Sequence, residues 1–525
     1  MPPKGNSTAL EPLDRNLALK RRDVETALRL PPRRHRRHSR SGRWRRRWAE
    51  LAREGELSRR FLLAAPLIAI GFAIWAFGGV YGWAFGLAYL LVFSAVAVWA
   101  LLAGLGRSPA QWRPVYAPML AFGGLVGAQY ALGFSVVPAS TSTAMLHLSA
   151  AGGVFLLVSQ LYRAERDARW LTAAFSVFTA TLALLAILQN LTGSNGIYWT
   201  FTYAFASPAG SFVNKNNFAG CMEMLLPVAC VQAYWHRHDS WLYALPWAAP
   251  PALGVAAVVL SASRGGAASL MVEMLAGLVV LWRVEHRAAS TLELPGWLPW
   301  PDAPPAARKP HAERRHRHQG HQHRRPLRGR RHGDPWRIAK LLGRRGSRWA
   351  TLAGAVALTV ALVLSVGTQR LDRRLSAANP NTPSFEQRDL LNLSSWTMFT
   401  ERPLVGWGLG TWPDIYPAFS RFTDASVFQF AHNDYLQLLA ETGLAGVGCT
   451  VLFWWVWGVE FRRRFRQWPA GRGRPPAAPV AVAAAIACLG ILVHSWVDFN
   501  LHIPANLMLF FALAALAIPP RLASL

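Results

Sequence analysis

Five ionisable residues lie at the ends of long apolar runs, where a charged side chain beside a membrane usually has a purpose or a partner. They are Lys215, Arg264, Arg388, His432 and Asp498. Two guanidinium groups and an ammonium group suit an anion, and a guanidinium fork matches the oxygens of a diphosphate. An imidazole can take a proton near neutral pH. The set predicts a reaction in which a diphosphate-linked donor meets an acceptor hydroxyl that His432 activates.

The segments expected beside these residues contain no Asp-x-Asp pair and no carboxylate cluster. Such clusters are what Mg²⁺ and Mn²⁺ sites use, so we expect no metal ion and no other cofactor. Protein cations would then have to stabilise a departing phosphate group. A diphosphate donor, a basic histidine and an acceptor hydroxyl together describe a glycosyl transfer.

Each of these residues also has a purely structural interpretation. Arg264 could anchor a helix end at the lipid headgroups, although the adjacent pair Gly265–Gly266 indicates a close backbone approach or exposed amides at a helix start. Lys215 could be an ordinary loop residue, His432 a polar helix end, and Asp498 the structural partner of a cation. Their convergence on one side of a membrane favours a site.

The elements that must position these residues are membrane-spanning helices. Hydrophobic residues make up 52% of the 525-residue chain, which contains 24 Trp and 26 Phe, and short polar breaks separate its long apolar runs. This composition is typical of an all-α, polytopic transmembrane protein. Apolar runs of roughly 17–25 residues predict about twelve spans. They lie at residues 61–79, 82–105, 115–136, 144–162, 170–191, 216–234, 241–261, 266–284, 349–368, 436–460, 477–496 and 501–518.

The net charge of +29 is concentrated in residues 1–60 and 283–348, where most lysines and arginines lie. Both segments flank predicted spans, where basic residues mark the cytoplasmic side and attract anionic lipid headgroups. The tract PPRRHRRHSRSGRWRRRW alone would also fit a nucleic acid, but its position favours the membrane, and we expect no nucleic-acid partner. With a cytoplasmic N-terminus, alternate connections are basic and the C-terminus returns to the cytoplasm.

Four segments follow from this topology. They are a basic cytoplasmic arm (1–60), spans one to eight (61–284), a basic loop (285–348), and spans nine to twelve (349–525) with a large outer loop (369–431). The 285–348 loop is too polar to bury a core and is predicted to be disordered; its many arginines oppose a metal site at its histidines. The outer loop mixes aromatic residues with Gly-Pro turns, which is typical of an ordered loop.

Five stretches of the sequence resemble, in order, the O-antigen ligase / O-antigen polymerase superfamily of bacterial membrane glycosyltransferases. They are GSFVNKNNFAGCMEMLLP, the SRGG-like SASRGG, RPLVGWGLGTWPDIYPAF, AHNDYLQLLAETGLAGV and HSWVDFNLHIPANLMLFF. These stretches fall within roughly residues 200–270 and 385–515, inside a motif region of 200–515, and the first five spans match only in general character. One such motif is weak evidence, whereas five in order are strong evidence.

This resemblance implies a GT-C-like enzyme of the bacterial inner (cytoplasmic) membrane with a periplasmic active site. Such an enzyme takes a glycan from undecaprenyl diphosphate and transfers it with inversion and without a metal. It implies that Arg264 and Arg388 hold the diphosphate and that His432 deprotonates the acceptor hydroxyl, which makes these the expected catalytic residues. Four more arginines of the same loop could take the place of Arg388, namely Arg370, Arg373, Arg374 and Arg402.

Further residues beside the motifs are expected to bind substrate, namely Lys215, Asn214, Asn216, Asn433 and Asp498. The resemblance implies a ligase of lipopolysaccharide or surface-polysaccharide biosynthesis, whose acceptor is lipid A–core, or a polymerase that extends a growing polysaccharide. A protein hydroxyl is a third possible acceptor. A transporter of lipid-linked sugars would predict repeat symmetry or helices broken near mid-membrane, and a non-catalytic scaffold would leave Arg264 and His432 without a reason to share a face.

Overall fold

The computed structural model of the chain describes residues 55–194, 196–202, 208–237, 239–290, 385–422, 428–467 and 477–518. Contacts divide the chain into two units, Met1–Ser58 and Arg59–Leu525, and the second contains the helical bundle. Three predicted segments lie wholly or mostly outside the described residues: the arm (1–60), the basic loop (285–348) and the ninth span (349–368).

The described residues are predominantly helical and form no β-sheet, only two isolated bridges. In chain order the α-helices are α3 (Glu56–Trp75), α4 (Gly82–Gly104), α5 (Tyr116–Ala131), α6 (Pro138–Leu161), α7 (Ala164–Leu191), α8 (Lys215–His236), α9 (Trp241–Ser261), α10 (Arg264–Ser290), α13 (Phe385–Glu401), α14 (Trp412–Ile415), α15 (Asp434–Gln467), α16 (Ala477–His494) and α17 (Pro504–Ala517). Three 3₁₀ turns join them: η1 (Phe77–Gly79), η2 (Tyr416–Phe419) and η3 (Asn500–His502).

Eight of the described helices are long and apolar enough to cross a membrane, namely α3, α4, α6, α7, α8, α9, α10 and α15. The shorter α5, α16 and α17 occupy the positions of three more predicted spans. Each predicted span except the ninth therefore coincides with a described helix. The prediction of an all-α, polytopic membrane bundle is confirmed.

The breaks between spans follow from local backbone chemistry. Gly78 and Gly79 both have φ of +73°, a left-handed conformation that glycine adopts without strain, and they end the first span. A Cβ on Gly78 would also lie 2.8 Å from the ring of Phe212. Pro504 opens α17, because proline fits the first helical position and disfavours helix in the residue before it.

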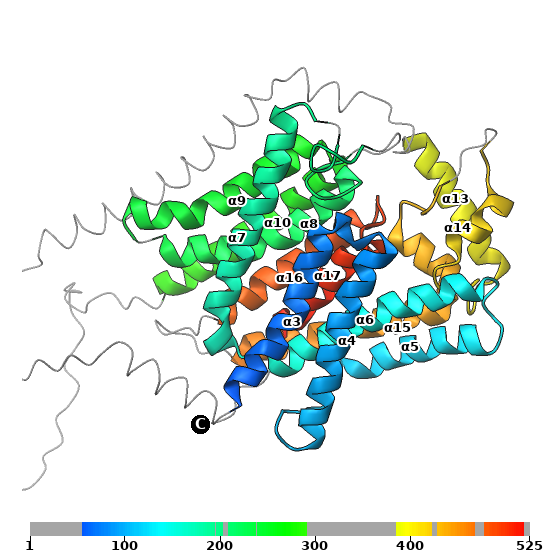
Figure 1. The fold of residues 1–525 in the computed structure, drawn as a ribbon, viewed down its shortest axis with the longest axis horizontal. Coiled ribbons are helices and arrows are strands. Elements are labelled where there is room, and N and C mark those ends of the chain that lie inside the picture. The colour runs from blue at the N-terminus through cyan, green and yellow to red at the C-terminus, as the bar shows by residue number, and fades with distance from the viewer. Residues whose placement is uncertain are drawn as a thin grey trace, which may run out of the picture. The chain divides into compact units, whose positions relative to one another are not determined.

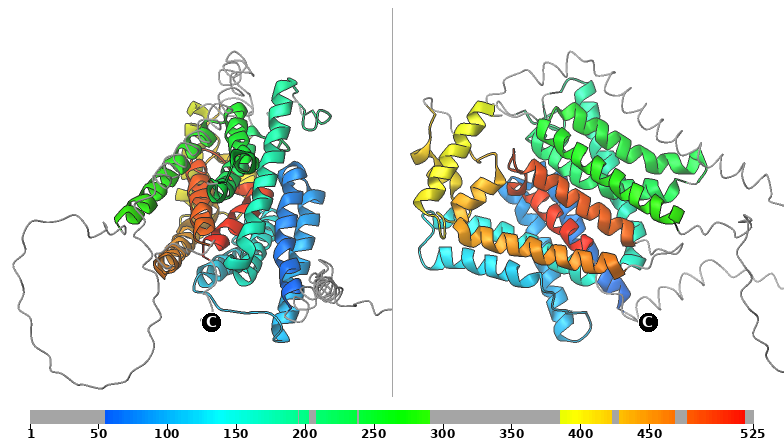
Figure 2. Two further views of the ribbon diagram at one scale, coloured as in Figure 1. Left: turned by 90° about the vertical axis from the view of Figure 1, so that its left-hand side faces the viewer. Right: turned by 180° about the vertical axis from the view of Figure 1, so that it is seen from behind.

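The helices α8, α16 and α17 lie at the centre of the packing, with α7, α9 and α10 on one side and α4, α5, α6 and α15 on the other (Figures 1 and 2). Within its most apolar window, 72% of α8 is buried, compared with 22% for α4 and for α10. The central helices therefore carry the buried core, whereas α4 and α10 present apolar side chains that a lipid bilayer would cover.

One end of the bundle is tied together by two buried arginines. Arg59 donates to both carboxylate oxygens of Asp167, at 2.7 and 2.9 Å, and to the carbonyl of Leu161. Arg113 donates to the carbonyl of Ile518 at 2.7 Å. The starts of α3, α5 and α7 and the ends of α6 and α17 thus share this end. The predicted topology, in which successive connections lie on alternate sides of the membrane, requires these helix ends to lie on the same side.

Candidate active site

Asp498 is the residue on which three of the predicted site residues converge, namely Asn216, Arg388 and His432. Its carboxylate is 1% exposed and accepts hydrogen bonds from Asn216 Nδ2 at 2.6 Å and from the amide of Phe499 at 2.9 Å. The Nδ1 atom of His432 lies 3.5 Å from its Oδ1 atom, and Nη2 of Arg388 lies 3.9 Å from its Oδ2 atom. Residues from the starts of three helices therefore meet at the turn between α16 and η3.

The charge of Asp498 is stabilised by these neighbours. Burial by itself raises the pKa of Asp498, but the interaction with His432, together with the positive charges of His494 and Arg388, outweighs burial and lowers it to about 2. The carboxylate is therefore ionised at neutral pH. An ionised carboxylate this close to a histidine can orient the imidazole and stabilise it when it takes a proton.

Two of the predicted binding residues are helix caps. The side-chain oxygen of Asn214 accepts from the amide of Asn216 at 2.8 Å and begins α8. Asn433 begins α15 in the same way, accepting from the amides of Tyr435 and Leu436 at 3.1 and 3.2 Å. Asparagine is a favoured residue at this position because it satisfies amides that have no partner inside the helix. Both caps hold the backbone that carries a site residue.

The turn that carries Arg264 is built from short contacts. Ala262 adopts a left-handed φ of +55° after α9, and the Ser263 hydroxyl accepts from the amide of Gly266 at 3.2 Å, which caps α10. A Cβ on Gly265 would lie 2.5 Å from Cδ2 of His494. The glycines are therefore required by close approach to α16 and α8, one of the two explanations that the sequence suggested.

Arg264 and Arg388 bring two like charges together. Burial lowers the pKa of Arg388, the charge of Asp498 raises it, and the charge of Arg264 lowers it again, so that the net direction is downward. Arg264 is exposed, and Lys215, the first residue of α8, is half-buried. The positive charges of Arg264 and Arg388 act on each other, and a pair of guanidinium groups suits an anion.

Buried polar atoms without a hydrogen-bond partner lie on α13 and just before α15. Within the described part of the chain they include Nε of Arg388, Oδ1 of Asn392 one turn later on α13, and Nδ1 of His432. Buried polar groups in proteins are nearly always satisfied, so each such atom needs an explanation. A polar ligand that both donates and accepts hydrogen bonds would satisfy Nε of Arg388 and Oδ1 of Asn392, whereas Nδ1 of His432 faces the carboxylate of Asp498 at 3.5 Å.

His432 is held by a hydrogen-bonded chain that runs through the first turns of α15. His432 has a left-handed φ of +53° and is 6% exposed. Its ring and that of Phe499 pack edge to face, with 4.7 Å between their centroids. The preceding amide, of Ala431, donates to Oε1 of Gln437 at 3.0 Å, and Nε2 of Gln437 donates to Glu441 at 3.1 Å. This chain fixes the backbone that aims the imidazole.

Glu441 joins that chain to the outer loop. Its carboxylate accepts from the amides of Gly410 at 2.8 Å and Trp412 at 3.1 Å. The ring of Trp412 stacks on Tyr416 with 4.4 Å between centroids, in a small buried cluster that is separate from the main core. Sequence analysis did not single out Glu441; a glutamate inside an apolar run, AETG, was the available signal.

The outer loop also completes a kink in α15. Gly443 leaves helical geometry, at φ +60° and ψ −164°, so hydrogen bonds of the helix are lost there. The amides of Leu444 and Ala445 donate instead to the carbonyls of Pro403 and Leu404 at 2.8 and 3.0 Å. On the other side of the kink, the carbonyl oxygens of residues 440 and 441 accept from the loop amides of residues 407 and 408. The loop thereby supplies the partners that a kinked helix needs.

A second aspartate–histidine pair lies beside the first and was not predicted. Asp434 Oδ1 lies 2.7 Å from Nδ1 of His502, and its Oδ2 atom accepts from the amide of Leu501 at 3.2 Å. Burial lowers the pKa of His502, but Asp434 and Glu441 raise it more, so that the net direction is upward. The segments 432–434 and 498–502 thus pair reciprocally. The sequence signal for this second pair was that each of the two motifs contains both a His and an Asp, namely His432 and Asp434 in the first and Asp498 and His502 in the second.

The arginines of the outer loop differ in what they contact. Arg402 lies over the ring of Trp407, at 4.2 Å, and donates to the carbonyl of Phe134. Of Arg388 and Arg402, only Arg388 approaches Asp498. Arg421 is exposed and donates to Thr397. Three further loop arginines, Arg370, Arg373 and Arg374, lie outside the described residues.

No group of three or more His, Cys, Asp or Glu residues in the described ranges is arranged to hold a metal ion. The predicted independence from metal concerns the reaction itself, and it therefore stays a prediction. Activity measured in a chelator is the observation that tests it.

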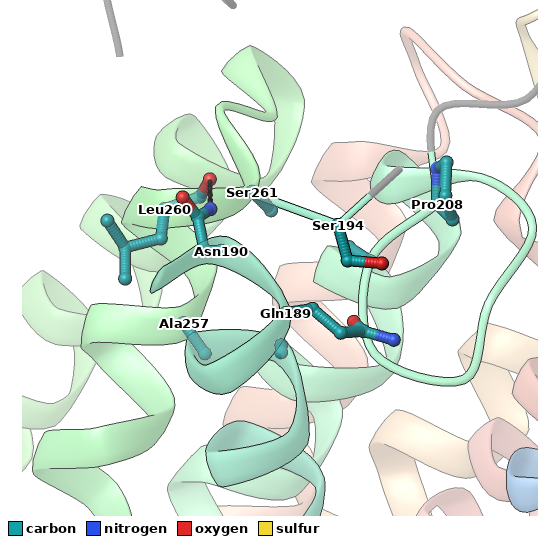
Figure 3. A pocket seen from close by; sticks show the side chains of 9 residues that line it. Gln189, Asn190, Ser194, Pro208, Ala257, Leu260 and Ser261 are labelled. Carbon is teal, nitrogen blue, oxygen red and sulfur yellow. Dashed lines mark hydrogen bonds between the residues drawn. The ribbon is translucent and has the colours of Figure 1, made fainter. Parts of the chain in front are cut away.

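A pocket lies close to the Arg264 turn but has a different character (Figure 3). It is formed by the end of α7, the segment before α8 and the end of α9, up to Ser261. Gln189 donates to the carbonyl of Gly210 at 2.8 Å and Asn190 to that of Leu260 at 3.0 Å. None of the residues that line it is ionisable, so it lacks the cations that a diphosphate requires.

Comparison with known proteins agrees with the resemblance of the motifs. The family model described as O-antigen ligase matches residues 336–451. This range contains Arg388 and His432, whereas Lys215, Arg264 and Asp498 lie outside it. A comparison with curated proteins found no match. The chain is thus an integral membrane protein of apolar helices in which the segment 336–451 is similar to the O-antigen ligase family, the family that its motifs resemble.

Proposed function

We propose that this protein is an inverting, metal-independent glycosyltransferase of the O-antigen ligase type. It transfers a glycan from undecaprenyl diphosphate to an acceptor hydroxyl on the periplasmic face of the inner membrane. The observation that carries the proposal is the gathering of Arg388, His432 and Asn216 around Asp498 at one end of the helix bundle. Residues far apart in the sequence supply the cations and the base that this reaction needs.

In the proposed mechanism Arg264 and Arg388 bind the diphosphate of the donor. Asp498 faces Nδ1 of His432, which leaves Nε2 to take the proton of the acceptor hydroxyl. The oxygen of the acceptor attacks the anomeric carbon as the bond from that carbon to the phosphate oxygen breaks. The electron pair leaves with the diphosphate, whose growing charge the guanidinium groups stabilise. Attack from the face opposite the leaving group inverts the anomeric centre.

Arg388 is the preferred second arginine for two reasons. Its side chain is 16% exposed and lies 3.9 Å from Asp498, whereas Arg402 packs on Trp407. Its Nε atom also has no hydrogen-bond partner in the described structure, and a diphosphate oxygen would be a suitable acceptor for it. The acceptor remains open between lipid A–core, a growing polysaccharide and a protein hydroxyl.

The test uses purified full-length protein and a short-chain isoprenyl-diphosphate sugar in EDTA. We expect the isoprenyl diphosphate to be released and the glycan to be transferred, and we expect both to be lost in His432→Ala and Arg264→Ala. The matched control is Arg421→Ala, because Arg421 is an exposed loop arginine that donates to Thr397 and should leave turnover unchanged. Full activity in both site variants would reject the mechanism, and uptake of the donor without bond cleavage would indicate a transporter.

A further inference from the structure

An acid–base pair inside the membrane-spanning bundle lies next to the proposed site and has no role in the reaction described above. His494, the last residue of α16, is 1% exposed, and Glu223 of α8 is fully buried. The two are joined by a hydrogen bond of 2.9 Å between Nδ1 and Oε1. A buried ion pair contributes little net stability compared with apolar packing, so its presence calls for another explanation.

The pair is not isolated in the bundle. Glu273 of α10 is 4% exposed, and its carboxylate packs so closely on Gly490 that a Cβ there would overlap Oε1. Oε2 of Glu223, Nε2 of His494 and both carboxylate oxygens of Glu273 have no hydrogen-bond partner in the described part of the chain. Such a set of polar atoms between α8, α10 and α16 is costly to bury, which indicates that it has a function.

His494 connects this set to the proposed diphosphate site. Because Glu223 holds Nδ1, the opposite edge of the ring, with Cδ2 and Nε2, is turned toward Gly265. A Cβ on Gly265 would lie 2.5 Å from Cδ2 and 2.6 Å from Nε2. Arg264 is the adjacent residue, and Asp498 lies four residues beyond His494. The imidazole is therefore in contact with the turn that carries one ligand of the diphosphate and precedes the carboxylate at the centre of the site.

We propose that the Glu223–His494 pair positions the diphosphate-binding turn, with Glu223 holding the imidazole of His494 against Gly265 and so setting the place of Arg264. This inference rests on the proposed function, because it assigns a purpose to the turn of Arg264. Glu223 and His494 are positioning residues and do not contact the substrate. A displacement of about 1 Å at a binding group can cost up to two orders of magnitude in rate or affinity.

The experiment measures binding of a short-chain isoprenyl diphosphate to the purified full-length protein, together with the KM for donor and for acceptor. Glu223→Gln keeps the volume of the side chain but removes its charge, and His494→Ala removes the contact. For both we expect the Kd of the isoprenyl diphosphate and the donor KM to rise roughly tenfold or more, with the acceptor KM unchanged. A thermal melt reports whether each variant is folded.

Two further variants keep the test informative if His494→Ala is unstable. Gly265→Ala should weaken diphosphate binding by pushing the turn away from the imidazole. In the His494→Ala background the same substitution should weaken binding less than in the wild type, because the clash with the imidazole is gone and only the 3.0 Å approach to Val497 remains. His147→Ala is the matched control: His147 is a half-buried histidine of α6 that hydrogen-bonds Tyr89 at 2.7 Å and is not part of the turn. It should leave diphosphate binding unchanged.

The outcomes separate this inference from the proposed function. If Arg264→Ala loses diphosphate binding while folded Glu223→Gln and His494→Ala bind as wild type does, the pair is only structural and the inference is wrong. If Arg264→Ala itself binds as tightly as wild type, the proposed diphosphate site fails and the inference fails with it. A rise in donor KM without a change in acceptor KM supports the inference.

Discussion

Replacing Asp498 with Asn should separate the charge of the carboxylate from its shape. Asn keeps the size of the side chain, and its one oxygen can accept only one of the two wild-type hydrogen bonds, because Asn216 donates to Oδ2 at 2.6 Å and the amide of Phe499 donates to Oδ1 at 2.9 Å. It removes the negative charge that lies 3.5 Å from His432 and 3.9 Å from Arg388. The change therefore tests what the charge contributes together with one of these hydrogen bonds, and only the contribution of the charge should depend on pH.

The magnitude follows from the pKa of Asp498, which its surroundings lower from 3.8 to about 2. Each pKa unit corresponds to about 1.4 kcal/mol, so the ionised form gains about 2 kcal/mol of stability in the folded protein. Because the folded pKa is the lower one, this contribution is present above the unfolded pKa of about 3.9. It is lost as the pH falls toward the folded value. The side chain is 1% exposed, so solvent screening is small.

Unfolding in detergent, followed across pH, measures this contribution. At pH 7 we expect Asp498→Asn to be less stable than wild type by about 2 kcal/mol, and the difference should shrink below pH 4. Turnover of the isoprenyl-diphosphate sugar should fall roughly 100-fold or more, because His432 loses the anion that stabilises its protonated form. Asp389→Asn, a change at an exposed acid of α13, is the matched control and should alter neither quantity.

The result that refutes the reasoning is a variant that turns over as fast as wild type while His432→Ala is inactive. That outcome would mean that His432 acts without its carboxylate. A stability difference that stays constant from neutral to acidic pH would contradict the assignment of the charge, since the ion pair must disappear as Asp498 is protonated. Either result would leave the fold intact and remove the carboxylate from the mechanism.

Three other changes test the rest of the structure. Burial lowers the pKa of His502, but Asp434 and Glu441 raise it more, so protonated His502 stabilises the folded protein and this contribution is lost as the pH rises through the folded pKa. His502→Gln should therefore destabilise the protein most at about pH 6 and less at higher pH, which pH-dependent melting measures. Glu441→Gln should cost about 2 kcal/mol by weakening charge-assisted bonds to the loop amides, and faster proteolysis of residues 403–412 would report the loosened loop. Arg59→Met should cost about 3–5 kcal/mol in unfolding experiments by leaving Asp167 buried without its partner, while folded protein keeps its turnover.

Much of the architecture could be predicted from the sequence because membrane helices are specified locally. A run of apolar residues long enough to cross a bilayer must satisfy its own backbone hydrogen bonds, and helix is the only structure that does so within one segment. The structure explains the ends of several helices by the conformations that Gly78–Gly79, Asn214 and Pro504 allow. The predicted bounds did not use these signals: Asn214 was expected to bind substrate, and the last span was placed at 501–518, whereas α17 begins at Pro504.

The pairing inside the site is a different matter, because it depends on contacts between distant segments. His432, Arg388 and Asp498 could be singled out by type and position. That Asp498 is the common partner depends on how α8, α13 and α15 pack against the turn after α16. Glu441 was missed for the same reason: its partners are backbone amides of a loop about 30 residues earlier, which no residue type in its own motif reveals.

The reciprocal pairing of the last two motifs predicts that each motif depends on the other. His432 of the first motif faces Asp498 of the second, while Asp434 of the first holds His502 of the second. The amide of Asp434 also donates to the carbonyl of Ser495, and the rings of Phe430 and Phe499 stack 4.4 Å apart. We therefore expect a change in either segment to displace both imidazoles. Since one imidazole is the proposed base, the position of that base is determined jointly by two segments more than 60 residues apart, and substitutions in the second motif should alter turnover as strongly as those in the first.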